Sequence, residues 1–366
     1  MTLQIAVRHA FKGFDLDVGI EAPPGVTVLF GPSGSGKTTL INAVAGLLQP
    51  DQGRIVADDW VLLDSDARRF LPPHRRRIGY IFQEGRLFPH LTVRQNLLYG
   101  RWFAPRDARS ESLARVVEML GIGALLDRRP GVLSGGEKQR VAIGRALLSG
   151  PKLILADEPL AALDEARKAE ILPYFERLRD EVSVPILYVS HSSSEVARLA
   201  TTVVALKAGR VVACGPPAQV LGDVAAVGAR GAASVLSARV VAHHPDGLSE
   251  LVTAAGPLWL PRVAPAPGAT IRVRIAAQDV ILSRERPQGL SALNILSGRI
   301  IEIRLGDGPG AIVTLAMSGD RLSARITRRS VEAMALEPGQ TCHAIIKSVA
   351  FAPDDVGTGQ LHDAAN

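Results

Sequence analysis

The sequence predicts an α/β domain followed by a smaller all-β domain. In the first part of the chain, short apolar runs (VTVLF, LILAD, ILYVS) alternate with longer helical stretches, which favours a largely parallel sheet with helices around it. From Val235 onward the pattern changes to short β-rich runs separated by Asp-Gly and Pro-Gly turns. We therefore expect one domain over residues 1–230 and a second over 235–355.

Length and composition agree with two folded domains. The chain has 366 residues, of which 47% are hydrophobic and 21% are charged. Single domains usually run to roughly 100–200 residues, and this apolar content is enough for a sizeable core. The small residues around Gly228 and Gly231 mark the place where we expect the linker.

Charge and cysteine content narrow the function classes. The net charge is +6, but the basic residues occur in short scattered groups such as Arg75-Arg76-Arg77, with few aromatic side chains beside them. We interpret these groups as solvated surface and expect no nucleic-acid partner. Cys214 and Cys342 are the only cysteines and have no metal-ligand spacing, so we expect neither a disulfide framework nor a zinc site, and a reducing compartment fits best.

Membrane-spanning segments are not expected. The first ten residues, MTLQIAVRHA, contain no apolar signal segment, and no run of about 18 uncharged apolar residues occurs. We expect the chain to reach a membrane only through partner proteins.

The all-β part repeats itself. The run LSARVV at Leu236 is echoed by LSGRII at Leu296, and the stretch that starts at Pro267 is echoed by the stretch at Pro338. Because both echoes occur in the same order, we expect two related half-units, although β-rich segments also resemble each other by chance. The half-units are expected over residues 235–285 and 290–355.

A glycine-rich loop predicts a phosphate-binding site. Residues 31–38 read GPSGSGKT, the P-loop pattern, between the apolar run VTVLF and a helical stretch. The glycines let backbone N–H groups turn inward around phosphate, and the following helix points its positive end at the anion. A tight packing turn is the structural alternative. The expected nucleotide-binding residues are Gly31, Pro32, Ser33, Gly34, Ser35, Gly36, Lys37, Thr38 and Thr39.

Individual roles within this loop follow from chemistry. Lys37 is expected to reach the β and γ phosphates, the Thr38 hydroxyl to ligate Mg²⁺, and Thr39 to contact the α phosphate. The apolar run LILAD ends in two carboxylates. Asp157 suits the coordination sphere of Mg²⁺, and Glu158 is placed to polarise an attacking water as a general base.

Between these motifs lies a second anion-binding pattern. Residues 133–140 read LSGGEKQR, in which Ser134, Gly135 and Gly136 offer a hydroxyl and bare backbone N–H groups at a helix start. This segment resembles the signature motif of ABC-family ATPases, which implies that the first domain is a P-loop NTPase ABC cassette. The resemblance implies a head-to-tail homodimer, in which the signature of one chain closes over the γ-phosphate held by the P-loop of the other, so that two ATP molecules are buried at one interface.

The remaining elements of that family occur in the expected order. By resemblance, Gln83 contacts Mg²⁺ and the attacking water, Asp164 bridges the dimer interface, and His191 contacts the γ-phosphate. A lone histidine after a strand is more often structural, but the other motifs around it favour the functional role. Phe11 and Phe14 are the nearby candidates for the aromatic that stacks on adenine, and either can instead belong to the core.

A narrower resemblance concerns the cargo. The segment QEGRLFPHLTVRQNLLYG and the tail runs SALNILSGRI and PGQTCHAIIKSV are similar to the ATP-binding subunit of bacterial molybdate importers. That resemblance implies an all-β tail of the OB-like barrel class and ATP-driven import of molybdate or tungstate. Candidate oxyanion contacts in this tail, against the alternative of ordinary barrel-surface residues, are Ser291, Asn294, Arg299 and Lys347.

The same resemblance implies partners and a location. Transmembrane permease subunits would dock a coupling helix on residues 86–99, and a periplasmic or lipoprotein molybdate-binding protein would act indirectly. The chain would then lie at the cytoplasmic face of the inner membrane as a peripheral subunit.

Three alternatives stay open. Another importer ATPase of this class, for sulfate, iron, polyamine or sugar, also has a β-rich tail, and the repeated LS-[AG]-R-[VI] pattern is the discriminating feature. A soluble ATPase acting on DNA or the ribosome usually has a coiled-coil insertion or two fused cassettes, whereas the spacing between Lys37 and Asp157 is uninterrupted here. A non-catalytic oxyanion-binding regulator would not need Glu158.

Overall fold

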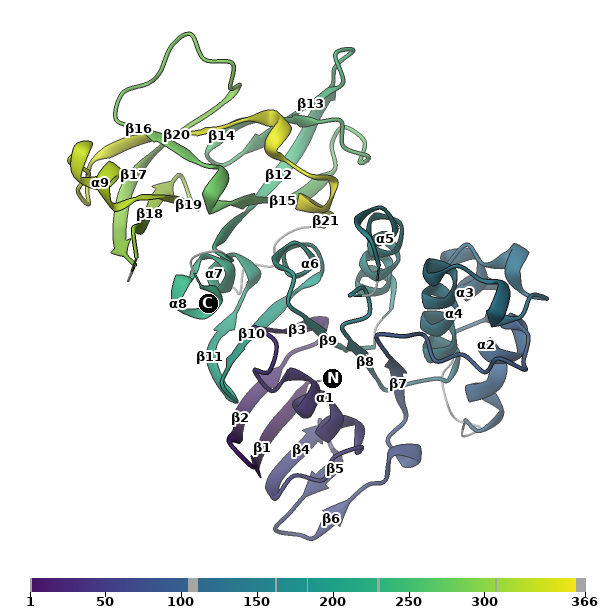
Figure 1. The fold of residues 1–366 in the computed structure, drawn as a ribbon. Helices are drawn as coiled ribbons and strands as arrows, with labels where there is room; N and C mark the ends of the chain where they lie inside the picture. Colours follow the sequence, from purple (N-terminus) through teal and green to yellow (C-terminus); the bar gives the residue numbers. More distant parts are fainter. Residues whose placement is uncertain are drawn as a thin grey trace. The chain divides into compact units, whose positions relative to one another are not determined.

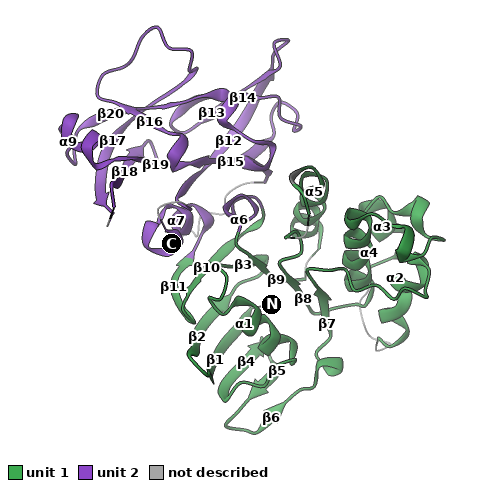
Figure 2. Ribbon diagram, viewed as in Figure 1, with its two compact units in different colours: residues 1–191, 199–214 green, residues 192–198, 215–366 purple. Residues whose placement is uncertain are grey.

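The structure is a computed structural model, shown along the chain in Figure 1. It divides into two compact units, residues 1–191 with 199–214, and residues 192–198 with 215–366 (Figure 2). The expected linker at Gly228 to Gly231 includes residues 229 and 230, which lie outside the described part. The described residues are 2–104, 111–161, 163–182, 184–228, 231–306 and 308–359.

The first unit is built on one mixed sheet. In the described residues its strand order is β6-β5-β4-β1-β2-β11-β10-β3-β9-β8-β7. Its strands are β1 (Leu3–Phe11), β2 (Phe14–Ala22), β3 (Val26–Phe30), β4 (Gln52–Ala57), β5 (Trp60–Asp64), β6 (Arg69–Phe70), β7 (Ile78–Ile81), β8 (Leu153–Asp157), β9 (Ile186–Ser190), β10 (Thr202–Lys207) and β11 (Arg210–Gly215).

The expectation of a largely parallel sheet is wrong for half of these strands. Each adjacent pair in the run β10-β3-β9-β8-β7 is parallel, whereas each adjacent pair in the run β6-β5-β4-β1-β2 is antiparallel. The reason is partly local, because hairpins join β1 to β2 and join β4, β5 and β6 in turn. Gly13, with φ of 87°, completes the two-residue turn that returns β1 into β2.

Helices surround the parallel half of the sheet. They are α1 (Lys37–Ala45), η1 (Pro73–Arg75), α2 (Val93–Trp102), α3 (Leu113–Met119), η2 (Gly123–Leu125), η3 (Pro130–Val132), α4 (Gly135–Leu148) and α5 (Glu165–Glu181). Leu40 and Ile41 of α1 are fully buried in the same core as Leu29 of β3 and Leu155 of β8. α2, α3 and α4 pack together in a separate helical group beside the sheet (Figure 1).

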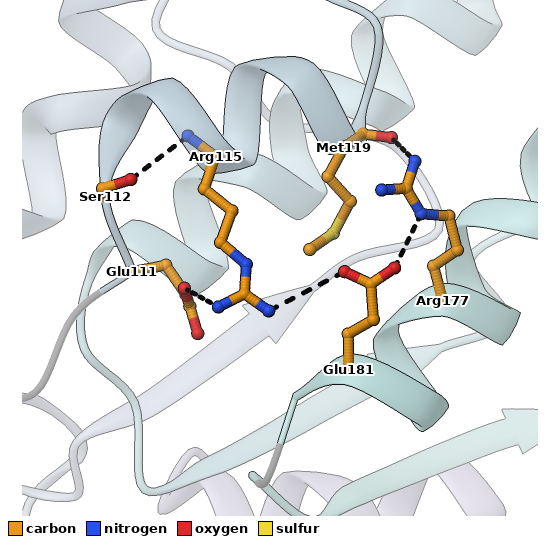
Figure 3. Close-up of polar contacts among 6 residues, drawn as sticks. All are labelled: Glu111, Ser112, Arg115, Met119, Arg177 and Glu181. Atoms are coloured by element: carbon orange, nitrogen blue, oxygen red, sulfur yellow. Dashed lines mark hydrogen bonds and ion pairs between the residues drawn. The ribbon is translucent and has the colours of Figure 1, made fainter.

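A polar network joins this helical group to α5. Arg115 of α3 lies 3.3 Å from Glu111 and 3.7 Å from Glu181 of α5. Arg177 donates to the other oxygen of Glu181 at 2.9 Å and to the carbonyl of Met119 at 3.1 Å (Figure 3). These half-exposed ion pairs are weak one by one, and they act together with apolar packing to orient α3.

The second unit contains two five-stranded sheets in its described residues, and the expected all-β tail is therefore confirmed. Their orders are β14-β13-β12-β15-β21 and β16-β20-β17-β18-β19. One apolar core is shared by both sheets. The strands are β12 (Ala233–His243), β13 (Leu248–Thr253), β14 (Gly256–Pro261), β15 (Thr270–Ala276), β16 (Ile281–Ser283), β17 (Asn294–Leu305), β18 (Gly310–Met317), β19 (Asp320–Thr327), β20 (Thr341–Ile346) and β21 (Val356–Thr358).

The two echoed segments occupy equivalent places in these sheets. β12 pairs with β15 so that Arg239 lies opposite Thr270, and β17 pairs with β20 so that Arg299 lies opposite Thr341. Each long strand is also irregular at the equivalent point of its pairing with the next strand. The irregularities lie between Val240 and Ala242, and between Ile300 and Glu302.

The halves exchange their last strands. β16 follows the first half but pairs with β20 of the second, and β21 follows the second half but pairs with β15 of the first. Hydrogen bonds from equivalent positions also connect the two halves. Asn294 Oδ1 accepts from the Trp259 N–H at 2.6 Å, and Ser234 Oγ accepts from the Ser323 N–H at 2.9 Å. Neither half therefore forms a complete sheet by itself.

Short helices also belong to the second unit. They are α6 (Ser193–Leu199), α7 (Pro217–Gly222), α8 (Val224–Val227), η4 (Ala277–Asp279), α9 (Arg328–Ala333), η5 (Ser348–Ala350) and η6 (Pro353–Asp355). We expected residues up to 230 in the first domain, but α7 and α8 cluster with the tail because α7 packs on β12 and β19 and buries Val220 and Leu221. Among the described residues, no helix is both long and apolar enough to span a bilayer.

Candidate nucleotide site and its relatives

The glycine loop connects β3 to α1, as the pattern predicts. Gly31 has φ of 151°, and a Cβ there would lie 2.2 Å from the carbonyl oxygen of Leu206. Gly36 has φ of 102°, and a Cβ there would lie 2.8 Å from Leu16. Both positions therefore require glycine, and the loop can keep its backbone N–H groups close to an anion.

Lys37 is held beneath this loop. Its side chain is 4% exposed, and Nζ donates to the carbonyls of Gly31 at 2.8 Å and Pro32 at 2.9 Å. Burial lowers the pKa of Lys37, while the charges of Glu158 and Asp157 oppose that shift. The buried Ser35 hydroxyl has no hydrogen-bond partner among the described residues. A cradle with an uncommitted hydroxyl fits a phosphate ligand.

Thr38 and Asp157 meet beside Lys37. The Thr38 hydroxyl donates to Asp157 Oδ1 at 3.3 Å, so two oxygen ligands of the kind that Mg²⁺ prefers lie together. Burial raises the pKa of Asp157, and the hydrogen bond from Thr38 opposes that shift. The donor set fits Mg²⁺, provided that phosphate and water complete the coordination sphere.

Glu158 follows in a strained backbone conformation. Its φ is 43°, in the left-handed region that residues other than glycine rarely adopt. The strain turns the carboxylate back toward the cleft, where Oε1 lies 3.9 Å from Lys37 Nζ and Oε2 lies 3.4 Å from His191 Nδ1. Such strain is often stored at functional sites. The structure thus brings together Lys37 from the start of α1, Glu158 from the end of β8 and His191 from the end of β9.

Lys37 and Glu158 line one cleft of about 530 Å³, whereas His191 is not among its lining residues. Gln83, which follows β7, lines the same cleft as the P-loop and the carboxylates. The lining residues are Phe11, Phe14, Ser33, Gly34, Gly36, Lys37, Thr38, Thr39, Gln83, Asp157 and Glu158.

Both aromatic candidates lie in this cleft but differ in exposure. The Phe14 ring packs under the loop, since a Cβ on Gly36 would lie 3.1 Å from it. Phe11 is 41% exposed, and its ring makes an edge contact with His9 at 4.3 Å between centroids. Phe11 is therefore the residue with a free aromatic surface at this cleft.

The signature residues lie elsewhere on the same unit. Ser134 caps α4, because its hydroxyl accepts from the Glu137 N–H at 3.3 Å while Glu137 accepts from the Ser134 N–H at 2.7 Å. None of the residues 134–136 lines the nucleotide cleft. Asp164 caps α5, because its carboxylate accepts from the Arg167 N–H at 2.9 Å, and its side chain is 62% exposed.

A second groove, of about 450 Å³, lies beside Gln83. It joins the segment after β7 to the start of α4. Its lining residues are Gln83, Glu84, Gly85, Arg86, Leu87, Pro89, Pro130, Gly131, Gly135, Lys138, Gln139, Pro159 and Leu163. Phe88, by contrast, is half-buried; its backbone N–H donates to Asn96 Oδ1 at 2.8 Å, and its carbonyl accepts from Asn96 Nδ2 at 3.1 Å.

The four oxyanion candidates are not brought together. Asn294 starts β17 opposite Ile346, next to Lys347, whereas Arg299 lies at the far end of the same strand pair, about 17 Å away at the usual rise per strand residue. Ser291 and Lys347 are exposed near the Asn294 end. Asn294 is fully buried, and its amide is engaged with Trp259 and Ser348, so it is not free to contact an oxyanion.

Sequence reasoning missed two residues that hold the site. Arg76 was interpreted as solvated surface, but it is fully buried and donates to carbonyls in the last turn of α1. Nothing in the run Arg75-Arg76-Arg77 indicates that its middle residue is buried. Tyr80 lies between Asn42 and Asp157, and no motif singled it out because the contact depends on how β7, β8 and α1 pack.

Comparisons with known proteins decide the family. Residues 17–161 match the ABC transporter family, and residues 290–352 match the TOBE domain. The chain is 52% identical to the molybdenum import ATP-binding protein ModC of Mesorhizobium japonicum, over 98% of both chains. The chain belongs to the family of molybdenum import ATP-binding proteins. The corresponding protein of Rhizobium etli is also 52% identical, over 96% of this chain and 99% of its own length.

Solved structures agree with the cassette fold. An ATP-binding cassette of an ABC transporter in its ADP conformation has a TM-score of 0.52 and 28% identity, and covers 62% of this chain and 97% of its own. A nucleotide-free cassette gives the same TM-score and identity and covers 62% and 98%. The predicted ABC cassette with an all-β tail is therefore confirmed.

Proposed function

We propose that this chain hydrolyses ATP to power the import of molybdate, or tungstate, through an ABC transporter. The observation that supports this most directly is the single cleft in which Lys37, Asp157 and Glu158 face the glycine loop. The relatives named for molybdenum import support the choice of cargo over sulfate, iron, polyamine or sugar.

The chain's own groups have distinct parts in the proposed reaction. Lys37 and the loop N–H groups bind the phosphates, and Thr38, Gln83 and Asp157 hold Mg²⁺, which neutralises phosphate charge when it is bound. Glu158 takes the proton of the attacking water. His191 lies 3.4 Å from Glu158 and keeps the Glu158 carboxylate aimed at the cleft. When ATP binds, His191 contacts the γ-phosphate.

A second copy of the chain completes the site. Because Ser134, Gly135 and Gly136 do not line their own cleft, they are available to close over the γ-phosphate of a partner. Asp164 is exposed at the start of α5, as a residue at that interface must be. We expect ATP to convert Glu158→Gln protein from monomer to dimer in analytical ultracentrifugation, and Gly135→Asp, which adds a carboxylate against phosphate, to prevent it.

The groove beside Gln83 is the proposed docking place of the permease subunits. It borders both the nucleotide cleft and the start of α4. A subunit docked in this groove would therefore contact residues next to both. Trp102 and Phe103, at the end of α2, are 59% and 74% exposed, which supports a protein contact in this region. The chain would then be peripheral, at the cytoplasmic face of the inner membrane, and a molybdate-binding protein would deliver cargo from the other side.

The tail is proposed to sense molybdate and thereby regulate turnover. Ser291 and Lys347 are the candidates that remain at one end of β17, and Arg299 would belong to a different place. Calorimetric titration of the purified chain should give heat with molybdate and not with sulfate, and Lys347→Ala should remove it. Equal heats for both anions would reject the regulatory role.

Two experiments test the main function. ATPase activity of the complex with its permease should rise when the binding protein is loaded with molybdate or tungstate, and not with sulfate. The Glu158→Gln variant should bind ATP and release no phosphate. A chain that kept its transport activity with Glu158→Gln would be acting as a binding regulator and not as the motor.

A further inference from the structure

Tyr80 connects two parts of the nucleotide site that the motifs treat separately. Its hydroxyl lies 3.3 Å from Asn42 Oδ1 of α1 and 3.4 Å from Asp157 Oδ2 of β8. Asp157 uses its other oxygen, Oδ1, to accept from Thr38 at 3.3 Å. The two oxygens of one carboxylate are thus engaged from opposite sides.

Hydrogen-bond accounting gives the direction of these contacts. A phenol has one proton, and an ionised carboxylate can only accept. The amide oxygen and nitrogen of Asn42 are interchangeable by a flip of its side chain. The arrangement that satisfies every group has the Asn42 amide donating to the Tyr80 oxygen and Tyr80 donating to Asp157.

The Tyr80 ring is itself held in place. It stacks on Phe82, with 4.1 Å between ring centroids and 18° between planes. The Arg86 guanidinium in turn lies 4.4 Å from the Phe82 centroid. Because β7 pairs with β8 through Tyr80 and Leu155, the backbone also fixes the distance to Asp157. The hydroxyl therefore reaches the carboxylate with little freedom to move.

We propose that Tyr80 is a positioning residue that orients the Asp157 carboxylate so that Oδ1 faces the Mg²⁺ of a bound nucleotide. This inference rests on the proposed metal role of Asp157. Outer partners of metal-binding carboxylates fix the ligand orientation, and their loss typically costs about 10–100-fold in metal affinity or activity.

The test separates metal binding from folding. In a Glu158→Gln background, which prevents turnover, ATP affinity is measured by calorimetry with Mg²⁺ and again with EDTA. Tyr80→Phe keeps the stacked ring and removes only the hydroxyl. We expect the affinity with Mg²⁺ to fall by about tenfold, while the affinity in EDTA and the melting temperature stay unchanged.

Tyr174→Phe is the matched control. It removes a half-buried hydroxyl of α5 that lies 3.4 Å from Arg140, away from the cleft. This variant should change neither affinity. Equal loss of affinity with and without Mg²⁺ in Tyr80→Phe would mean that the hydroxyl serves the fold only, which overturns the inference. No change in either condition overturns it as well.

A double variant distinguishes this inference from the function it rests on. If Asp157→Asn removes the Mg²⁺ dependence and Tyr80→Phe adds nothing further to it, the two residues act as one unit. Additive losses would overturn the positioning role of Tyr80. Full Mg²⁺ dependence in Asp157→Asn would instead reject the proposed metal role of that carboxylate, whatever Tyr80→Phe does.

Discussion

Arg76 donates from Nη1 to the carbonyl oxygen of Val44 at 2.8 Å, in the last turn of the helix that begins at the P-loop. The same nitrogen donates to Ala43, and Nε donates to Leu71. Gly46 leaves the necessary room, since a Cβ there would lie 2.6 Å from Nε. Burial lowers the pKa of Arg76 to about 10, so the guanidinium remains charged at neutral pH and offsets the negative end of α1.

Replacing Arg76 should therefore destabilise the cassette. Arg76→Met removes the charged donors from two buried carbonyls and one partly buried carbonyl, and we expect the free energy of unfolding to fall by about 3 kcal/mol. Urea denaturation of the purified chain measures this change. Arg75→Met, at an exposed neighbour, is the control and should stay within about 0.5 kcal/mol. Similar small effects for both variants would show that water replaces the Arg76 cap.

Phe11 should determine the affinity for the base of the nucleotide. It is the aromatic with exposed surface in the cleft, and base stacking on an aromatic ring contributes about 1–3 kcal/mol. Phe11→Ala should weaken ATP binding by about tenfold, measured by calorimetry with Glu158→Gln protein. Phe11→Trp keeps a stacking surface and should restore the affinity. Unchanged ATP affinity in Phe11→Ala would show that the base does not stack on Phe11.

Leu87 is a sharper probe of permease docking than Phe88. Phe88 also lies within residues 86–99, but it is half-buried against Tyr99 and its backbone N–H is bonded to Asn96, so a charge there would also disturb α2. Leu87 lines the groove itself. Leu87→Asp should abolish transport in reconstituted vesicles while the isolated chain binds ATP normally.

The control for docking is a charge of the same kind placed elsewhere. Ile281 is 56% exposed on the tail, and Ile281→Asp should leave transport unchanged. Transport at the normal rate by Leu87→Asp would show that the permease contacts another surface.

Glu137 should make the signature helix sensitive to acid. The hydrogen bond from the Ser134 N–H holds the pKa of Glu137 below its ordinary value of 4.5. A carboxyl whose pKa is lower in the folded state stabilises the fold above the unfolded pKa, and that contribution is lost as pH falls through the folded value. Glu137→Gln keeps a capping side chain without a titrating group. The difference in unfolding free energy between wild type and Glu137→Gln should therefore shrink below pH 4.5, and a constant difference would contradict the cap's role.

Local patterns predicted much of the site because each is written in consecutive residues. The run VTVLF coincides with β3, and LILAD coincides with β8. A P-loop needs glycines at fixed offsets for steric reasons, so Gly31 and Gly36 could be placed before any packing was known. The expected family and the all-β tail followed from motifs of the same local kind.

Packing across distant segments could not be predicted in this way. Asn294 was a candidate ligand by residue type, but its amide is buried between strands of opposite half-units, which depends on the exchange of β16 and β21. The antiparallel half of the first sheet likewise depends on which strands pair, and apolar runs do not specify a direction.

The sequence alone determined the phosphate cradle, the two carboxylates after β8, the helix start at Ser134 and the family, because each of these depends on residues that are close together along the chain. Only the tertiary structure decided that Arg76 closes the helix behind the cradle and that Tyr80 holds Asp157 from the next strand. A hydrogen bond between segments exists only after strands and helices have packed and excluded water. Its partners therefore become visible in space and not along the chain.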